Sequence, residues 1–82
     1  MEYSQQVSVN TLQRLPTYLN YLKSLDDDGN ISSTEIARAL GLNDVQVRKD
    51  LSSVSSGGRP KVGYNIRGLI LDLKEFLGYN AV

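Results

Sequence analysis

The side chains of this sequence that could do chemistry are carboxylates, amines and tyrosines, because it contains neither histidine nor cysteine. That absence removes a Cys/His zinc site, a Ser-His-Asp triad and an imidazole general base. The acidic run from Asp26 to Asp28, followed by Gly29, has the composition of a calcium loop. Counted from the first aspartate, however, Ile31 occupies the sixth position and Ala37 the twelfth, where an EF-hand needs Gly and Glu. We therefore expect this segment to be a solvated loop without a metal site. Because the sequence offers so few catalytic groups, we also expect that the protein is not an enzyme.

The basic side chains are concentrated between Arg38 and Arg67. This stretch holds six Lys or Arg against two Asp, a net charge of +4, while the rest of the chain carries −4 and the total is zero. A local basic stretch can attract a polyanion such as nucleic acid while the neutral total keeps the chain soluble. The alternative at this point is an ordinary surface with uneven charge.

Length and composition indicate one small domain over residues 1–82. A chain of 82 residues with 40% hydrophobic and 22% charged residues is typical of a globular protein with a single core. The longest aliphatic run, from Leu69 to Leu71, is far shorter than the roughly 20 apolar residues of a membrane span. The first twenty residues do not resemble a secretory signal, and no disulfide is possible, so we expect a cytoplasmic protein without membrane contact.

Two long helices should build most of the core. Leucines spaced by three or four residues predict a helix over about residues 8–25, with Leu12 in its apolar stripe. Pro16 should either kink this helix or end it and start a new one. A last helix over about 66–77 should end at Gly78. The side chains that it should bury are Ile66, Leu69, Ile70, Leu73, Phe76 and Leu77.

Between them, two short helices form a helix-turn-helix pattern. Ser32 and Glu35 have the spacing of a capping box at the start of a helix over 33–40, and Gly41 should end that helix in the left-handed conformation. Asn43 and Gln46 repeat the capping spacing and start the next helix, over 44–53. A turn of about three residues that contains Gly joins the two helices, as in DNA-binding helix-turn-helix units.

The helix over 44–53 presents a polar face opposite its core face of Val47, Leu51 and Val54. On that outer face Lys49 could donate to guanine O6 and N7, and Val45 could contact a thymine methyl group. The alternative is a solvated helix face. The residues that we expect to contact DNA from this helix are Val45, Gln46, Arg48, Lys49, Ser52 and Ser53.

The segment over about residues 54–64 should form a wing. Small residues and glycines from Ser55 to Pro60 precede an extended run from Lys61 to Tyr64, which predicts a hairpin with Arg59 and Lys61 at its tip. The expected fold class is therefore mainly α with a small β-hairpin wing, a winged helix-turn-helix.

Four strings resemble the N-terminal winged-helix domain of the Rex family of redox-sensing bacterial repressors, in matching order and separation across nearly the whole chain. These strings are RLPTYLNYL from Arg14, ISSTEIARALGL from Ile31, VQVRKDLS from Val45 and GRPKVGYNI from Gly58. The resemblance implies a domain that binds one half-site of a palindromic duplex operator and represses transcription. It also implies a C-terminal Rossmann domain that binds NADH or NAD and forms the homodimer. No GxGxxG of such a domain occurs here, so we expect no cofactor in these residues and a monomeric isolated domain.

The resemblance also assigns residue roles. It implies that Arg48 and Lys49 contact DNA and that the wing residues lie at or near the minor groove. It also implies that Arg14 lies near the DNA backbone or the interface with the second domain. The wing residues so assigned are Arg59, Lys61, Gly63 and Tyr64. The sequence departs from many relatives in having Lys61 where they carry glycine. Two other functions stay open: a DeoR-like repressor domain, and a winged helix that contacts only proteins.

Overall fold

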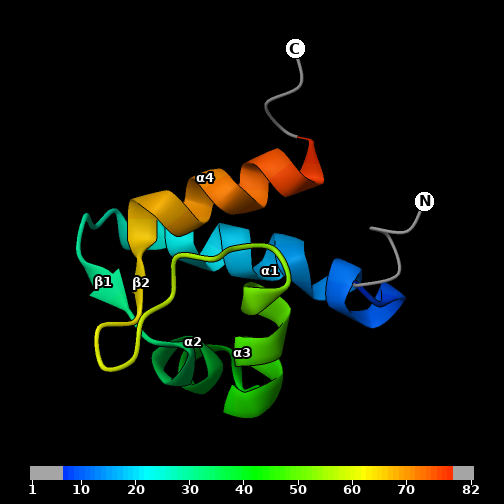
Figure 1. The fold of residues 1–82 in the computed structure, drawn as a ribbon, viewed down its shortest axis with the longest axis horizontal. Coiled ribbons are helices and arrows are strands. Elements are labelled where there is room, and N and C mark those ends of the chain that lie inside the picture. Colours follow the sequence, from blue (N-terminus) through cyan, green and yellow to red (C-terminus); the bar gives the residue numbers. More distant parts are fainter. Residues whose placement is uncertain (1–6, 79–82) are drawn as a thin grey trace.

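The structure is a computed structural model that describes residues 7–78 of the chain; the ends of the predicted 1–82 domain, residues 1–6 and 79–82, lie outside the described residues. Four helices and a two-stranded antiparallel sheet follow one another along this part of the chain (Figure 1). Their bounds are α1 Val9–Leu25, β1 Asn30–Ile31, α2 Ser33–Leu40, α3 Asp44–Ser52, β2 Tyr64–Asn65 and α4 Ile66–Leu77.

The helices α1 and α4 run antiparallel and pack on each other, and α2 and α3 form a second packed pair below them in the view of Figure 1. Apolar side chains from all four helices and both strands meet in one core. Its members are Leu15, Tyr18, Leu19, Leu22, Ile31, Ile36, Ala37, Val47, Leu51, Tyr64, Ile66, Leu69 and Leu73. This arrangement, with a loop beside the sheet as the wing, confirms the predicted winged helix-turn-helix.

Helix α1 runs without a break through Pro16, so the expected alternative of a new helix starting there is wrong. Buried Leu15 and Leu19 lie on either side of the proline and hold both turns against the core. Their burial compensates for the one backbone hydrogen bond that proline cannot donate. Ser8 begins the helix, because its hydroxyl accepts a hydrogen bond from the amide of Thr11 over 3.1 Å.

Two predicted core positions are also wrong. Leu12 is 41% exposed and Phe76 is 43% exposed, so both lie at the margin of the apolar stripes of their helices. The physical reason is that the stripe of a helix in so small a domain is narrow, and side chains at its edge meet solvent. The bounds predicted for α2 and α4 agree with the structure, and Ser53 caps α3 at its C-terminal end.

The sheet differs from the predicted hairpin. Residues 61–64 do not form a strand beside the Ser55–Pro60 segment; instead Ile31 pairs with Tyr64 and Asn30 with Asn65, across more than thirty residues of sequence. The wing itself is closed by a single antiparallel bridge between Arg59 and Gly63. Lys61 has φ +70 and therefore belongs to the turn, so Arg59 lies at the base of the wing and not at its tip.

The acidic run from Asp26 to Asp28 caps and ties the loop between α1 and β1. Asp26 adopts φ +49 at the C-terminal end of α1, and Asp27 accepts a hydrogen bond from the amide of Gly29 over 2.9 Å. Asp28 forms an exposed ion pair with Arg67. The Asp27 and Asp28 carboxylates thus have local roles in the loop, while Asp26 contributes its backbone conformation. None of the helices within residues 7–78 combines the length and apolar character that a bilayer crossing requires.

Candidate nucleic-acid interface

The turn between α2 and α3 is built as the sequence predicts. The Ser32 hydroxyl accepts from the Glu35 amide over 3.0 Å while the Glu35 carboxylate accepts from the Ser32 amide over 3.1 Å, which completes the capping box. Gly41 ends α2 at φ +71, and the amide of Leu42 donates to the Ala37 carbonyl over 2.8 Å. Asn43 then accepts from the amides at the start of α3. Two helices joined this tightly present α3 at a fixed angle.

Helix α3 has one buried and one exposed face. Val47 and Leu51 are fully buried against the core. On the opposite side Val45 is 44% exposed and Lys49 is exposed, and Arg48 is exposed on the flank. The structure thus gives α3 the polar outer face that a recognition helix needs to enter a major groove.

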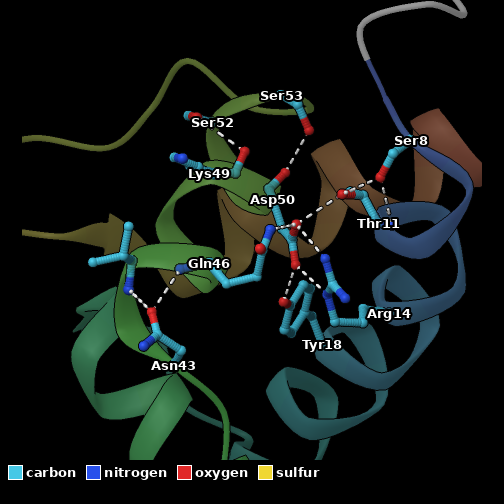
Figure 2. Close-up of polar contacts among 11 residues, drawn as sticks. Ser8, Thr11, Arg14, Tyr18, Asn43, Gln46, Lys49, Asp50, Ser52 and Ser53 are labelled. Carbon is cyan, nitrogen blue, oxygen red and sulfur yellow. Dashed lines mark hydrogen bonds and ion pairs between the residues drawn. The ribbon is translucent and has the colours of Figure 1, made fainter.

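A buried carboxylate anchors α3 to α1 (Figure 2). Asp50 is 1% exposed and accepts five hydrogen bonds: one each from Thr11, Tyr18 and Gln46, and two from Arg14. Thr11 donates over 2.8 Å, Gln46 Nε2 over 2.9 Å and Arg14 Nε over 2.6 Å. We call these five residues the Asp50 cluster. A buried charge needs such pairing, because an unpaired carboxylate in a core is strongly unfavourable.

The Asp50 cluster shifts the ionisation of its members. Burial alone would raise the pKa of Asp50, but the hydrogen bonds from Arg14, Tyr18, Thr11 and Gln46 favour the carboxylate and bring its pKa to about 2. The hydrogen bond to Asp50 raises the pKa of Arg14 above its ordinary value. Burial, followed by the hydrogen bond to Asp50, raises the pKa of Tyr18. At neutral pH the cluster is therefore an ionised carboxylate held by a guanidinium and neutral donors.

The wing is a short turn fastened to the sheet. Arg59 and Gly63 exchange backbone hydrogen bonds of 3.0 and 2.8 Å. Gly63 has φ +83, and a Cβ there would lie 2.4 Å from the carbonyl oxygen of Ile31. Gly58 passes over the ring of Tyr64, where a Cβ would lie 2.6 Å from the ring atom Cζ. Glycine is required at Gly63, because φ is positive there and the close neighbour is backbone; a side chain on Gly58 would have to push the Tyr64 ring aside.

An open groove separates α3 from the wing. Three of its lining side chains, Arg48, Arg59 and Lys61, are cationic, and none of the described residues that line it is acidic. The remaining lining residues are small or uncharged and are Ser32, Ser33, Thr34, Ser52, Ser55, Ser56, Gly58, Pro60, Gly63 and Tyr64. A cationic groove beside an exposed helix can hold the sugar-phosphate backbone of a nucleic acid.

The structure gathers many of the predicted contact residues at this groove but not all of them. Six line it: Arg48, Ser52, Arg59, Lys61, Gly63 and Tyr64. Val45, Gln46 and Lys49 lie on α3 outside the groove lining. Arg14 and Ser53 are engaged within the protein, Arg14 with the Asp50 carboxylate and Ser53 with the Asp50 carbonyl over 2.6 Å.

Sequence reasoning missed the serine-rich part of the groove. Ser32, Ser33 and Thr34 belong to the first turn of α2, and the pairing of β1 with β2 brings that turn beside the wing. The capping box marked Ser32 only as the start of a helix. Because two-residue strands carry no alternation pattern, no local signal indicated that the wing would lie next to it.

The comparisons with known proteins agree with this architecture. Residues 6–52 match the family described as "Putative DNA-binding protein N-terminus". The chain is 49% identical over 71 residues to the redox-sensing transcriptional repressor Rex of Porphyromonas gingivalis, covering 84% of this chain and 33% of that protein. It is 42% identical over 78 residues to Rex of Bacteroides fragilis, covering 93% of this chain and 36% of that protein. The chain thus spans about a third of the length of these relatives.

A solved structure is similar as well. The crystal structure of RSP in complex with beta-NAD+ and operator DNA superposes with a TM-score of 0.81 at 36% sequence identity. The similarity covers 88% of this chain and 34% of that one.

Proposed function

Because the chain belongs to the family of the N-terminal DNA-binding domain of Rex redox-sensing repressors, we propose that it is a sequence-specific duplex-DNA-binding domain of such a repressor. The observation that carries the proposal is the groove between α3 and the wing, whose charged lining residues Arg48, Arg59 and Lys61 are all cationic. This groove adjoins the outer face of α3, whose exposed residues suit a major groove. RSP, 36% identical to this chain, was crystallised on operator DNA.

In this proposal α3 enters the major groove. Lys49 donates to guanine O6 and N7, Val45 contacts a thymine methyl group, and Gln46 contacts a base edge. Arg48, which lines the groove of the protein, pairs with a phosphate and fixes the register of the helix on the duplex. Ser52 and Ser53 lie at the C-terminal end of α3, near the DNA backbone.

The wing contacts the adjacent backbone or minor groove. Arg59 and Lys61 supply its charge, while Gly63 and Tyr64 give it its shape. Arg14 acts indirectly, since its guanidinium is bound to Asp50 and its side chain is only 27% exposed. Its role is to hold α3 in place and, on its exposed edge, to approach a phosphate or a second domain.

The activity of the whole repressor lies beyond these residues. We infer that two copies, joined through a further domain that binds NADH or NAD, engage the two halves of a palindromic operator, with one half-site for each winged helix. These residues then bind no cofactor, catalyse no reaction and are monomeric by themselves. A bacterial repressor works on chromosomal DNA, so its location is the cytoplasm.

The test uses the 82-residue chain and duplex DNA. Selection from a pool of random duplexes should enrich one short motif. Titration of that motif at several salt concentrations should give a slope of log K against log salt of about −2.7 if three cations contact phosphates. Lys23→Ala, in an exposed residue of α1, is the matched control for loss of one charge and should leave the affinity unchanged.

Two results would contradict the proposal. No enriched motif together with no salt-dependent binding would favour a winged helix that contacts only proteins. An enriched motif that is not half of a palindrome would argue against the Rex-like arrangement of two domains on one operator.

A further inference from the structure

Gln46 is exposed to solvent and is also hydrogen-bonded to a buried residue. It lies in the first part of α3, next to Val45, and its residue surface is open to solvent. At the same time its Nε2 atom donates a hydrogen bond of 2.9 Å to Oδ1 of Asp50, which is buried. Figure 2 shows the Gln46 side chain reaching along α3, toward its C-terminal end, to the Asp50 carboxylate.

The carboxylate determines which way the Gln46 amide faces. An ionised carboxylate can only accept hydrogen bonds, so the NH₂ group of the amide must face it. The reverse orientation would bring the amide oxygen against a carboxylate oxygen, and two acceptors repel each other. One N–H of Gln46 is thus used inside the protein, and the amide oxygen and the second N–H remain for an outside partner.

The carboxylate in turn is held from the opposite side. Thr11, Arg14 and Tyr18 all belong to α1 and all donate to Asp50, so it cannot rotate to follow a moving Gln46. Gln46 therefore meets its partner with an amide that is already oriented, which reduces the entropy lost on binding.

We propose that Gln46 is a base-reading residue that selects adenine in the operator, and that Asp50 is the positioning residue that orients its amide. An oxygen acceptor beside an N–H donor matches the N6 amino group and the N7 atom of adenine in the major groove. Guanine presents two acceptors at the same edge and leaves the Gln46 oxygen without a donor. This inference rests on the proposed function, since it assumes that α3 lies in the major groove.

The first experiment compares selections. Wild type and Gln46→Ala are each used to enrich duplexes from the same random pool. The wild-type motif should contain one adenine whose preference Gln46→Ala loses, while the preferences at the other positions stay. If both chains enrich the same motif, the inference is overturned although the proposed function stands; if wild type enriches nothing, the proposed function fails instead.

Adenine analogues test the chemistry of the contact. In the selected duplex that adenine is replaced by purine, which lacks the N6 amino group, or by 7-deazaadenine, which lacks N7. Each replacement should weaken wild-type binding by about 10-fold, as expected for loss of a base contact. Binding of Gln46→Ala to the normal and modified duplexes should be equal. Equal losses in both proteins would show that another residue reads this base.

Asp50→Asn tests the positioning role. An asparagine can present either its oxygen or its nitrogen to Gln46, so both orientations of the Gln46 amide become possible. Discrimination of adenine from guanine should therefore fall by several-fold, while the affinity for random duplex is kept. Tyr18→Phe is the matched control, because it removes one donor to Asp50 while Thr11 and Arg14 still hold the carboxylate and the Gln46 bond is kept. It should keep the adenine preference.

If Asp50→Asn does not fold, the side-chain NH₂ resonances of Gln46 in wild type decide the point. One slowly exchanging proton supports the bond to Asp50, and two rapidly exchanging protons refute it.

Discussion

Arg14 of α1 and Asp50 of α3 are 36 residues apart in sequence and form an ion pair with two hydrogen bonds, of 2.6 Å from Nε and 3.1 Å from Nη2. The Asp50 side chain has no exposed surface, whereas the Arg14 side chain is 27% exposed. The pair ties α3 to the long helix α1 that it crosses. The stability of the domain and the orientation of the α3 face proposed to bind DNA therefore depend on the same carboxylate.

Acid should weaken the domain over a defined range. The folded state lowers the pKa of Asp50 from 3.8 to about 2. The stability that this shift contributes is fully present above about pH 4 and is lost as the pH falls toward 2, because the unfolded chain takes up the proton first. A shift of this size corresponds to about 2 kcal/mol of unfolding free energy. Urea unfolding monitored by circular dichroism between pH 7 and pH 2 measures it.

Tyr18→Phe should reduce the stability and the acid response together. It keeps the buried ring and removes only the hydroxyl that donates to Asp50. We expect a loss of about 1 to 3 kcal/mol at pH 7, as for a hydrogen bond to a charged group. The pKa of Asp50 should rise, so the difference between variant and wild type should shrink at pH 2. A difference that does not change with pH would mean that the loss comes from packing.

The helix-turn-helix was predictable because its signals are local. The capping box of Ser32 and Glu35 and the left-handed Gly41 each act within one helical turn. The sheet and the Asp50 cluster were not predictable, because the two strands are distant in sequence and so are the α1 residues that bind Asp50. Asp50 follows Lys49 in a charged string, and charged residues are seldom buried. Only the crossing of α1 and α3 brings Arg14 and Tyr18 within reach of it.

Gly63→Ala should be far more harmful than Gly41→Ala. Both glycines have positive φ, +83 and +71, so alanine costs about 1 to 2 kcal/mol of unfolding free energy at either site. A Cβ on Gly63 would also lie 2.4 Å from the Ile31 backbone oxygen, while one on Gly41 would meet nothing within 4 Å. We expect Gly63→Ala to lose at least about 1 kcal/mol more in urea unfolding. Equal losses would show that the wing moves freely.

Lys61 should lower the stability of the domain through its backbone conformation and strengthen DNA binding through its charge. It adopts φ +70 in the turn of the wing, a conformation that glycine adopts without strain. Lys61→Gly should therefore stabilise the domain by up to about 1 kcal/mol relative to Lys61→Ala. Both variants remove the same charge from the groove lining, so both should reduce the salt slope of DNA binding by about one. Unfolding and salt titration of the two variants separate the effects, and a salt slope equal to that of wild type would exclude Lys61 from phosphate contact.

Lys49→Ala should damage recognition of the specific sequence more than binding to random DNA. The Lys49 side chain is exposed on the outer face of α3, and its ammonium group makes no ion pair within residues 7–78. A lysine that contacts guanine contributes about 1 to 3 kcal/mol of discrimination, whereas one that contacts a phosphate weakens all duplexes alike. Arg48 lines the groove, and in the proposed function it contacts a phosphate, so it is the matched comparison. Titration of the selected and a scrambled duplex with Lys49→Ala and Arg48→Ala should therefore give a sequence-dependent loss for the first and a uniform loss with a reduced salt slope for the second. The opposite pattern would mean that Arg48 contacts the base and Lys49 the phosphate. The helix α3 would then lie on the duplex in a rotated orientation, because the two side chains lie about 100° apart around the helix axis.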